Sequence, residues 1–367
     1  MRIVAALSGG VDSAVAASLL VAAGHEVIGV TLQLYNHAEA TARRGACCAG
    51  EDIHDARRVA DRLGIAHYVI DAEARFRDAV IADFADSYAA GETPVPCVRC
   101  NQTVKFADLT ALARGLGAER LATGHYVRRI DGPAGPELWR ACDAARDQSW
   151  FLFATTAEQL AFCLFPLGEM EDKAAVRAIA ARLGLPVADK PDSQDICFVP
   201  SGGYAAVVGR LRPEAMMPGE IVGSDGVVLG RHEGIARYTV GQARRLGEAA
   251  KGGQQGQGHV VVALDAARRR VVVGPRATGT TAIRLRETNW LTAPPPEGWR
   301  CQVKLRGRDG LRDALVCPGP DGTARVTLDA PALPAPGQAC VAYDGERVLG
   351  GGFIVRDSLA VAVDPAA

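Results

Sequence analysis

The sequence contains no apolar run close to the roughly 20 residues that a membrane-spanning helix needs. It also lacks the apolar segment of a secretory leader, because only Arg2 and five apolar residues stand between Met1 and Ser8. We therefore expect a cytoplasmic protein. No internal repeat is present, and 367 residues suffice for two or three domains with separate cores.

Cysteine is too scarce for a disulfide scaffold, with ten residues in the chain. The chain also has no large excess of positive or negative charge, since the net charge is −1. The first 200 residues nevertheless hold 20 basic and 26 acidic residues, whereas the remainder hold 21 and 16. A basic second half fits a polyanionic partner such as RNA, although a solvated basic face gives the same pattern.

A short glycine turn, Ser8-Gly9-Gly10-Val11-Asp12-Ser13, follows the apolar run Ile3–Leu7 and precedes a helix-like stretch. A strand, turn and helix in this order gather free backbone N–H groups at the positive end of a helix dipole, which favours phosphate. The spacing excludes a Walker loop, which needs Gly-Lys-Ser or Gly-Lys-Thr. An ordinary turn between strand and helix is the alternative. The segment resembles the pyrophosphate loop of the ATP pyrophosphatase superfamily, which implies ATP, with Mg²⁺, as the ligand.

The first 200 residues alternate apolar runs with amphipathic stretches of helical length, which predicts a parallel α/β sheet binding ligand at the carboxyl ends of its strands. We expect strands at Ile3–Leu7, Glu26–Leu34, Ala66–Asp71 and Arg120–Thr123. We expect helices near Val11–Ala23, Glu51–Leu63, Arg75–Ala90, Thr103–Leu116 and Lys173–Leu183.

Beyond residue 200, short strands alternate with turn residues, which predicts a small β-rich domain followed by a β-barrel or sandwich. The first group of strands is Glu220–Val222, Val227–Leu229, His259–Leu264 and Val271–Val273. The second is Ala282–Leu285, Cys301–Leu305, Ala314–Val316, Ala324–Leu328, Ala339–Tyr343 and Arg347–Leu349. The expected domains are 1–202 for ATP binding and catalysis, 203–278, and a C-terminal barrel over 279–360.

Two cysteine sites stand apart from the other thiols. Cys97 and Cys100 follow Pro94 and Pro96, which places them in a loop or at the start of a helix. A thiol there, beside Arg99 and Lys105, is expected to ionise more readily than usual. Alone, this pair fits a redox couple, half of a metal site, or chance. The second site is Cys197, in a polar segment.

Several motifs stand in the order found in the bacterial tRNA-specific 2-thiouridylases, and the chain resembles that family over nearly its whole length. They are Leu7–Ser13, Cys100-Asn101, Ala122–Tyr126, Asp147–Ser149, Asp192–Phe198, Tyr238–Gln242 and Leu349–Gly352. The resemblance implies ATP-dependent 2-thiolation of the wobble uridine of tRNA. The C2 carbonyl is adenylated, and sulfur is then transferred from a persulfide on Cys197 with Cys100 as nucleophile.

The resemblance also implies the residues of each subsite. Asp12 positions ATP or its magnesium. The ATP site comprises Ala6, Leu7, Ser8, Gly9, Gly10, Val11, Asp12, Ser13, Leu32 and Gly124. The residues implied to contact tRNA are His125, Arg146, Asp147, Gln148, Arg306, Gly307 and Gln338. A sulfur-relay protein or a cysteine desulfurase is the implied sulfur donor.

One departure concerns Cys97, where the best-known members of the family have Asp. Cys97, Cys100 and Cys197 offer three ligands for a [4Fe–4S] cluster, so cluster and persulfide schemes both stay open. Cys47 and Cys48 form a further pair without an assigned role.

Two other classes of function remain. A different ATP pyrophosphatase that adenylates a small molecule accounts for the glycine loop but not for the cysteines or the basic half. A non-catalytic RNA-binding or thiol-redox protein accounts for the cysteines and the charge but not for the loop.

Overall fold

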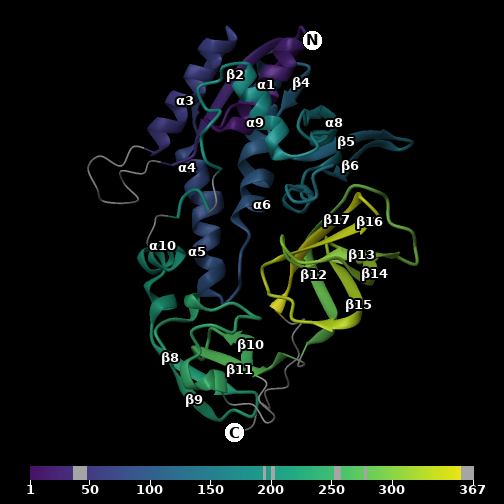
Figure 1. Ribbon diagram of the computed structural model, residues 1–367. Helices are drawn as coiled ribbons and strands as arrows, with labels where there is room; N and C mark the ends of the chain where they lie inside the picture. Colours follow the sequence, from purple (N-terminus) through teal and green to yellow (C-terminus); the bar gives the residue numbers. More distant parts are fainter. Residues whose placement is uncertain (36–47, 193–195, 200–202, 252–257, 277–278, 357–367) are drawn as a thin grey trace. The chain divides into compact units, whose positions relative to one another are not determined.

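The computed structural model describes residues 1–35, 48–192, 196–199, 203–251, 258–276 and 279–356 (Figure 1). The chain forms two compact units. The first comprises residues 1–80, 97–200 and 345–349, and the second comprises 81–96, 201–344 and 350–367. Each unit therefore contains segments that are distant in the sequence.

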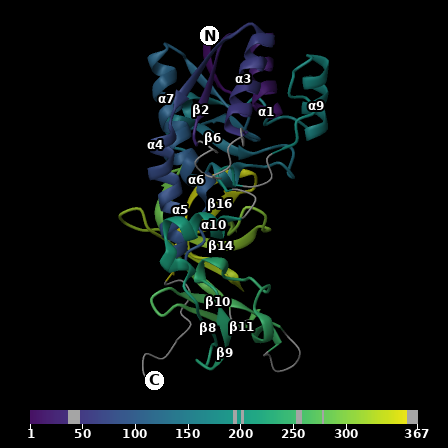
Figure 2. The same cartoon turned by 90° about the vertical axis from the view of Figure 1, so that its left-hand side faces the viewer.

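The first unit is built on a five-stranded parallel sheet of order β3-β2-β1-β4-β7. Its central strand β1 is buried on both faces, as expected for a parallel sheet covered by helices. Helices α1, α3 and α9 share one apolar core with β1, and α7 contacts β1 and β4 (Figure 2). Small side chains along α1, including Ala14 and Ala17, allow close packing on the sheet.

The elements of this unit have the following bounds. The strands are β1 Arg2–Ala6, β2 Glu26–Gln33, β3 Ala66–Asp71, β4 Arg120–Ala122, β7 Cys163–Leu164 and the hairpin β5 Val127–Gly132 and β6 Gly135–Arg140. The helices are α1 Val11–Ala22, α3 Cys48–Leu63, α4 Glu73–Phe76, α6 Pro96–Cys100, α7 Phe106–Gly115, α8 Ala157–Phe162 and α9 Lys173–Arg182. Two π-helical segments, η1 Arg77–Ile81 and η2 Asn101–Lys105, and the 3-10 turn η3 Ser149–Phe151 complete the set.

The second unit contains a four-stranded sheet of order β10-β11-β8-β9 and a barrel that closes through the pairing of β12 with β17. The smaller sheet comprises β8 Gly219–Gly223, β9 Val228–His232, β10 His259–Asp265 and β11 Arg270–Pro275. The barrel comprises β12 Thr280–Trp290, β13 Trp299–Lys304, β14 Arg312–Pro318, β15 Ala324–Ala332, β16 Ala339–Asp344 and β17 Arg347–Ile354. The helical elements are α5 Ala82–Ala89, α10 Tyr204–Leu211, η4 Pro213–Met216, η5 Ile235–Arg237 and η6 Gly247–Lys251.

The structure confirms the predicted fold class and corrects several elements. The helix expected over 75–90 is divided by η1, and the helix expected from 103 begins at Pro96. Proline at the first position of a helix is compatible with the fold because its missing N–H has no partner there in any case. The β5–β6 hairpin was not predicted.

The domain boundaries expected at 202, 278 and 360 fall outside the described residues and remain predictions. Within the described ranges, no helix is both long enough and apolar enough to cross a membrane.

The glycine run in β17 is explained by close backbone contacts. A Cβ atom on Gly351 would lie 2.4 Å from the carbonyl oxygen of Cys340, and one on Gly350 would lie 2.2 Å from that of Asn289. Strands approach this closely only where no side chain intervenes.

We predict that Gly351→Ala destabilises the barrel by about 1–3 kcal/mol, because the backbone of Cys340 must move. Urea unfolding followed by fluorescence measures the change. Gly310→Ala is the matched control, since nothing lies within 4 Å of its Cβ position. Equal stability of the two variants would contradict the steric explanation.

Candidate functional site

The glycine loop lies between the end of β1 and the start of α1. Gly9 has φ +75°, and a Cβ atom there would lie 2.3 Å from the carbonyl oxygen of Asp52 in α3. Glycine is therefore required both by the backbone conformation and by the approach of α3. Gly10 caps α1 in an extended conformation. The loop thus presents the amino end of a 12-residue helix, as the sequence predicts.

The two serines of the loop form hydrogen bonds with each other, so their hydroxyl groups are already engaged within the protein. The Ser8 amide donates to Ser13 Oγ at 3.0 Å, the two hydroxyls lie 3.1 Å apart, and Ser13 Oγ donates to the carbonyl of Gly10. These bonds order the turn in advance of ligand binding.

The carboxylate of Asp12 is held by a lysine that the sequence analysis did not identify. Lys173 Nζ donates to both oxygens of Asp12, at 2.7 and 2.8 Å, and Tyr126 donates its hydroxyl to Oδ1 at 2.6 Å. The same ammonium group lies 2.8 Å from Asp192. Asp12 is therefore already neutralised by a protein cation.

The carboxyl end of β4 lies directly against the loop. A Cβ atom on Gly124 would lie 2.7 Å from the amide nitrogen of Ser13, so only glycine fits. Leu32, near the end of β2, and Leu7, after β1, lie at the same edge of the parallel sheet. Ala6, Leu7, Leu32 and Gly124 therefore lie at the carboxyl edge of the sheet, and their contact with ATP stays a prediction.

The cysteine pair lies at the start of a continuous helical stretch formed by α6, η2 and α7. Cys100 is buried, whereas Cys97 and Cys197 are exposed. Cys197 is fixed by its neighbour Phe198, which packs edge-on against Phe76 at 5.7 Å. All three thiols are free. π-Helical segments such as η2 occur frequently at functional sites.

The three thiols and Lys105 influence one another electrostatically. Burial raises the pKa of Cys197 to about 12 and raises those of Cys97 and Cys100, and in each case Lys105 opposes the rise. Burial by itself would lower the pKa of Lys105, but the three cysteines reverse that effect and raise it. The expectation of unusually acidic thiols was wrong, because desolvation outweighs the lysine.

His125 links the glycine loop to the helical stretch that bears Cys97 and Cys100. It follows Gly124, stacks on Phe106 with ring centroids 6.0 Å apart, and lies 2.8 Å from the hydroxyl of Thr123 through Nδ1. Burial, and then Lys105, lower the pKa of His125 to about 3, so its ring is neutral at physiological pH. The thiols therefore lie at the same edge of the sheet as the loop.

Asn101, which follows Cys100, is 4 % exposed and donates through Nδ2 to the carbonyl of Phe151. Its Oδ1 atom has no hydrogen-bond partner within the described part of the chain. An unsatisfied buried acceptor is uncommon and calls for an explanation, for which a functional role is one candidate.

Metal binding finds no support in these side chains. Among the described residues, no group of three or more His, Cys, Asp or Glu side chains is arranged to hold a metal ion. The three cysteines interact electrostatically with Lys105. Cys47 lies outside the described residues, as do the side chain of Cys48 and residues 193–195.

The residues expected to contact tRNA in the first unit are bonded internally. Arg146 donates to Asp192 at 2.7 Å. The Asp147 carboxylate is 2 % exposed and accepts from Arg140 and Ser149. Gln148 Oε1 accepts from the amide of Tyr126. Asp147 therefore orders its own loop, and contact between tRNA and residues 146–148 stays a prediction.

In the second unit, two expected tRNA contacts also bind backbone. Arg306 donates to the carbonyl of Val240 at 2.7 Å, next to Gly241, and Gln338 donates to the carbonyl of Thr93 at 2.9 Å. Gly307 lies in the turn after β13. Arg306 and Gln338 thus connect the barrel to other segments of its own unit, and tRNA binding by these residues also stays a prediction.

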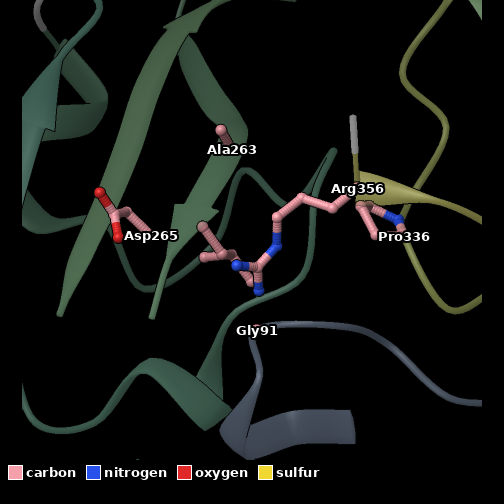
Figure 3. Close-up of a pocket in the computed structure, with 6 residues that line it drawn as sticks. Gly91, Ala263, Asp265, Pro336 and Arg356 are labelled. Atoms are coloured by element: carbon pink, nitrogen blue, oxygen red, sulfur yellow. The ribbon is translucent and has the colours of Figure 1, made fainter. Parts of the chain in front are cut away.

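A cavity of about 260 Å³ lies in the second unit (Figure 3). Arg356 extends across it, and a Cβ atom on Gly91 would lie 3.1 Å from its guanidinium group. The lining contains Gly91, Ala263, Leu264, Asp265, Pro336 and Arg356. It includes no cysteine and no residue of the glycine loop, so it is not the site of the chemistry.

Comparison with known proteins finds matches along most of the chain. Family models described as "tRNA methyl transferase HUP domain", "tRNA methyl transferase PRC-barrel domain" and "Aminomethyltransferase beta-barrel domain" match residues 1–201, 207–275 and 280–354. The NMN synthetase of Francisella tularensis is 22 % identical, with a TM-score of 0.33 over 52 % of this chain and 66 % of that one.

Two curated relatives match almost from end to end. The tRNA-specific 2-thiouridylase MnmA of Acidiphilium cryptum is 68 % identical over 97 % of this chain and 100 % of its own length. That of Gluconobacter oxydans is 63 % identical over 96 % and 99 %. The chain belongs to the tRNA-specific 2-thiouridylase family.

Proposed function

We propose that this protein is an ATP-dependent sulfurtransferase that 2-thiolates the wobble uridine of tRNA. The observation that carries the proposal is the position of three free thiols at the sheet edge that also bears the glycine loop. Adenylation of the carbonyl oxygen and attack by sulfur on the carbonyl carbon act on the same carbonyl group, so the two sites have to adjoin. Full-length relatives named for this reaction support the same conclusion.

In the first step, the loop at the start of α1 binds the phosphates of ATP, which enters with Mg²⁺. The O2 atom of the uridine attacks the α-phosphorus, and pyrophosphate leaves. The free N–H groups and the dipole of α1 stabilise the negative charge on the phosphates. Adenylation converts the carbonyl oxygen into AMP, a good leaving group.

In the second step, the terminal sulfur of a persulfide on Cys197 attacks C2, and AMP departs. The thiolate of Cys100 then attacks Cys197 Sγ, forming a Cys100–Cys197 disulfide and leaving the outer sulfur on the uridine. An external thiol reduces the disulfide. Burial raises the pKa of both thiols, and Lys105 opposes that rise and so favours the thiolate that each attack requires.

The sulfur arrives from outside the chain, from a relay protein or a cysteine desulfurase that passes a persulfide to Cys197. The exposure of Cys197 supports this role, because the donor's sulfur must reach it. Buried Cys100 suits the resolving step, which occurs within the protein.

We predict that Gly124→Ala lowers ATP affinity about tenfold or more, because the added methyl group displaces the backbone of Asp12 and Ser13. Isothermal titration calorimetry with ATP and Mg²⁺ measures the loss. Gly115→Ala, whose Cβ position has no neighbour within 4 Å, serves as the control and should bind like the parent. Unchanged affinity in Gly124→Ala would remove residues 8–13 from the ATP site.

Cys100→Ser and Cys197→Ser should each abolish thiolation while leaving tRNA affinity near that of the parent. Mass spectrometry of tRNA nucleosides after reaction with ATP and a sulfur donor measures the product, and a gel shift measures binding. Cys163→Ser, at a buried thiol in β7, is the control for loss of a cysteine. Thiolation by either site variant at the parental rate would refute the assigned roles.

Iron content separates the persulfide scheme from the cluster scheme. We expect protein purified without oxygen to be free of iron and active, and Cys97→Asp to retain thiolation. Elemental analysis and visible absorption provide the measurement. Iron in stoichiometric amount, lost together with activity in Cys97→Asp, would instead establish the cluster.

A further inference from the structure

The carboxylate of Asp12 stands at the amino end of α1, where the proposed function places the phosphates of ATP. Asp12 is the second residue of that helix, and its side chain is 33 % exposed. A negative charge at this position repels phosphate unless a cation compensates for it. Lys173 supplies that cation, because its Nζ donates to both Asp12 oxygens at 2.7 and 2.8 Å.

The acceptor capacity of the Asp12 carboxylate is largely used within the protein. An ionised carboxylate offers about four lone-pair positions. Lys173 takes one on each oxygen, and the hydroxyl of buried Tyr126 takes a second one on Oδ1 at 2.6 Å. A Mg²⁺ ion on Asp12 would therefore have to share the carboxylate with an ammonium group, which the repulsion between like charges disfavours.

Lys173 is held against the loop by its own helix. It is the first residue of α9, which Asp172 caps by accepting from the amide of Ala175 at 2.7 Å. Val176 and Ala180 of α9 belong to the same core as α1. The Lys173 side chain is only 11 % exposed. The ammonium group is therefore delivered to the start of α1 by a packed element, not by a loop.

The ion-pair cluster around Lys173 carries an excess of positive charge. Asp192 accepts from Lys173 at 2.8 Å. It also pairs with Arg146 at 2.7 Å and with Arg177 at 3.4 Å. Together with Asp12, the cluster contains two carboxylates and three cations, which leaves one positive charge. Such an excess beside the amino end of α1 favours an anionic ligand.

We infer that Lys173 is the cation that contacts the phosphates of ATP, and that Asp12 is a positioning residue that holds Lys173 there and does not ligate Mg²⁺. The carboxylate of Asp12 orients the ammonium group, while Mg²⁺ arrives bound to the phosphates. The inference rests on the proposed function in taking ATP with Mg²⁺ as the ligand of the loop. It deepens that function by choosing between the two roles that the family resemblance implies for Asp12.

The first test compares the binding of ATP and AMP by isothermal titration calorimetry in EDTA, where no divalent metal ion is available. We expect Lys173→Gln to bind ATP at least about tenfold more weakly than the parent, as for one lost charge-assisted hydrogen bond. Its affinity for AMP should change by less than about twofold, because AMP lacks the β- and γ-phosphates. Lys173→Arg keeps the positive charge and should lose less ATP affinity than Lys173→Gln. Equal weakening of ATP and AMP, or parental ATP affinity in Lys173→Gln, would overturn the inference.

A double variant separates a phosphate contact from mere neutralisation of Asp12. Asp12→Asn combined with Lys173→Gln removes both charges, so no unpaired carboxylate is left to repel ATP. We expect this protein to bind ATP as weakly as Lys173→Gln, because the contact with the phosphates is missing. Recovery of parental affinity would mean that Lys173 only neutralises Asp12, which contradicts the inference.

The role of Asp12 is tested by the metal dependence of binding. The ratio of ATP affinity with Mg²⁺ to that in EDTA measures the contribution of the metal ion. We expect Asp12→Asn to keep the parental ratio to within about twofold, because the carboxylate does not touch the ion. A ratio that falls to unity in Asp12→Asn would identify Asp12 as a metal ligand and refute its positioning role.

Lys190→Gln is the matched control for loss of a lysine that joins two aspartates. Lys190 bonds to Asp52 and Asp55 of α3 at 2.7 and 2.6 Å, and its bonds within the described ranges do not include one to Asp12. Its variant should bind ATP like the parent. A loss as large as that in Lys173→Gln would show that the effect is not specific to Lys173, and the assignment would fail.

Two checks keep the outcome decisive. Circular dichroism reports whether each variant folds, and if Lys173→Gln does not, the metal dependence of Asp12→Asn decides. Nucleoside mass spectrometry on the parent protein tests the proposed function separately. A parent that binds ATP and thiolates tRNA, together with a Lys173→Gln variant of parental ATP affinity, would refute this inference alone.

Discussion

The site depends on one backbone contact, that of Gly124 with Ser13. It joins the carboxyl end of β4 to the first turn of α1 at a distance that no side chain permits. His125 follows and stacks on Phe106, which continues the helical stretch bearing Cys97 and Cys100. The glycine loop and a thiol cluster from separate parts of the sequence are thereby fixed at one edge of the sheet, as successive reactions at one carbonyl group require.

Electrostatics within the site follow a second constraint, which is desolvation by the surrounding protein, even though Cys97 and Cys197 are partly open to solvent. Lys105 lowers the pKa of each cysteine, yet burial keeps all three thiols less acidic than an ordinary cysteine. Formation of a thiolate at any of the three cysteines must therefore overcome desolvation, and Lys105 supplies part of the compensation.

Much of the fold was predictable because helix and strand periods are local properties. The strand at Ala66–Asp71 and the helix starting at Lys173 match the structure at those residues. Charge partners were not predictable, since Lys173 stands 161 residues from Asp12 and no local pattern joins them. The burial of Asp147 was not predictable either, because no local pattern shows it. The acidity of the thiols was misjudged because a sequence shows neighbouring charges but not desolvation.

The second unit includes residues 81–96 as well as most of the chain beyond residue 200. Tyr88 of α5 stacks on Tyr204 of α10 with ring centroids 4.8 Å apart, and Glu92 forms a two-pronged ion pair with Arg286 of the barrel. A polypeptide ending at residue 200 would keep Tyr88 and Glu92 but lose Tyr204 and Arg286, with which they pair. The ring of Tyr88 and the unpaired carboxylate of Glu92 would then be exposed. Residues 1–200 are thus not a self-contained folding unit, and insertion or recombination at residue 200 would separate residues that pack together.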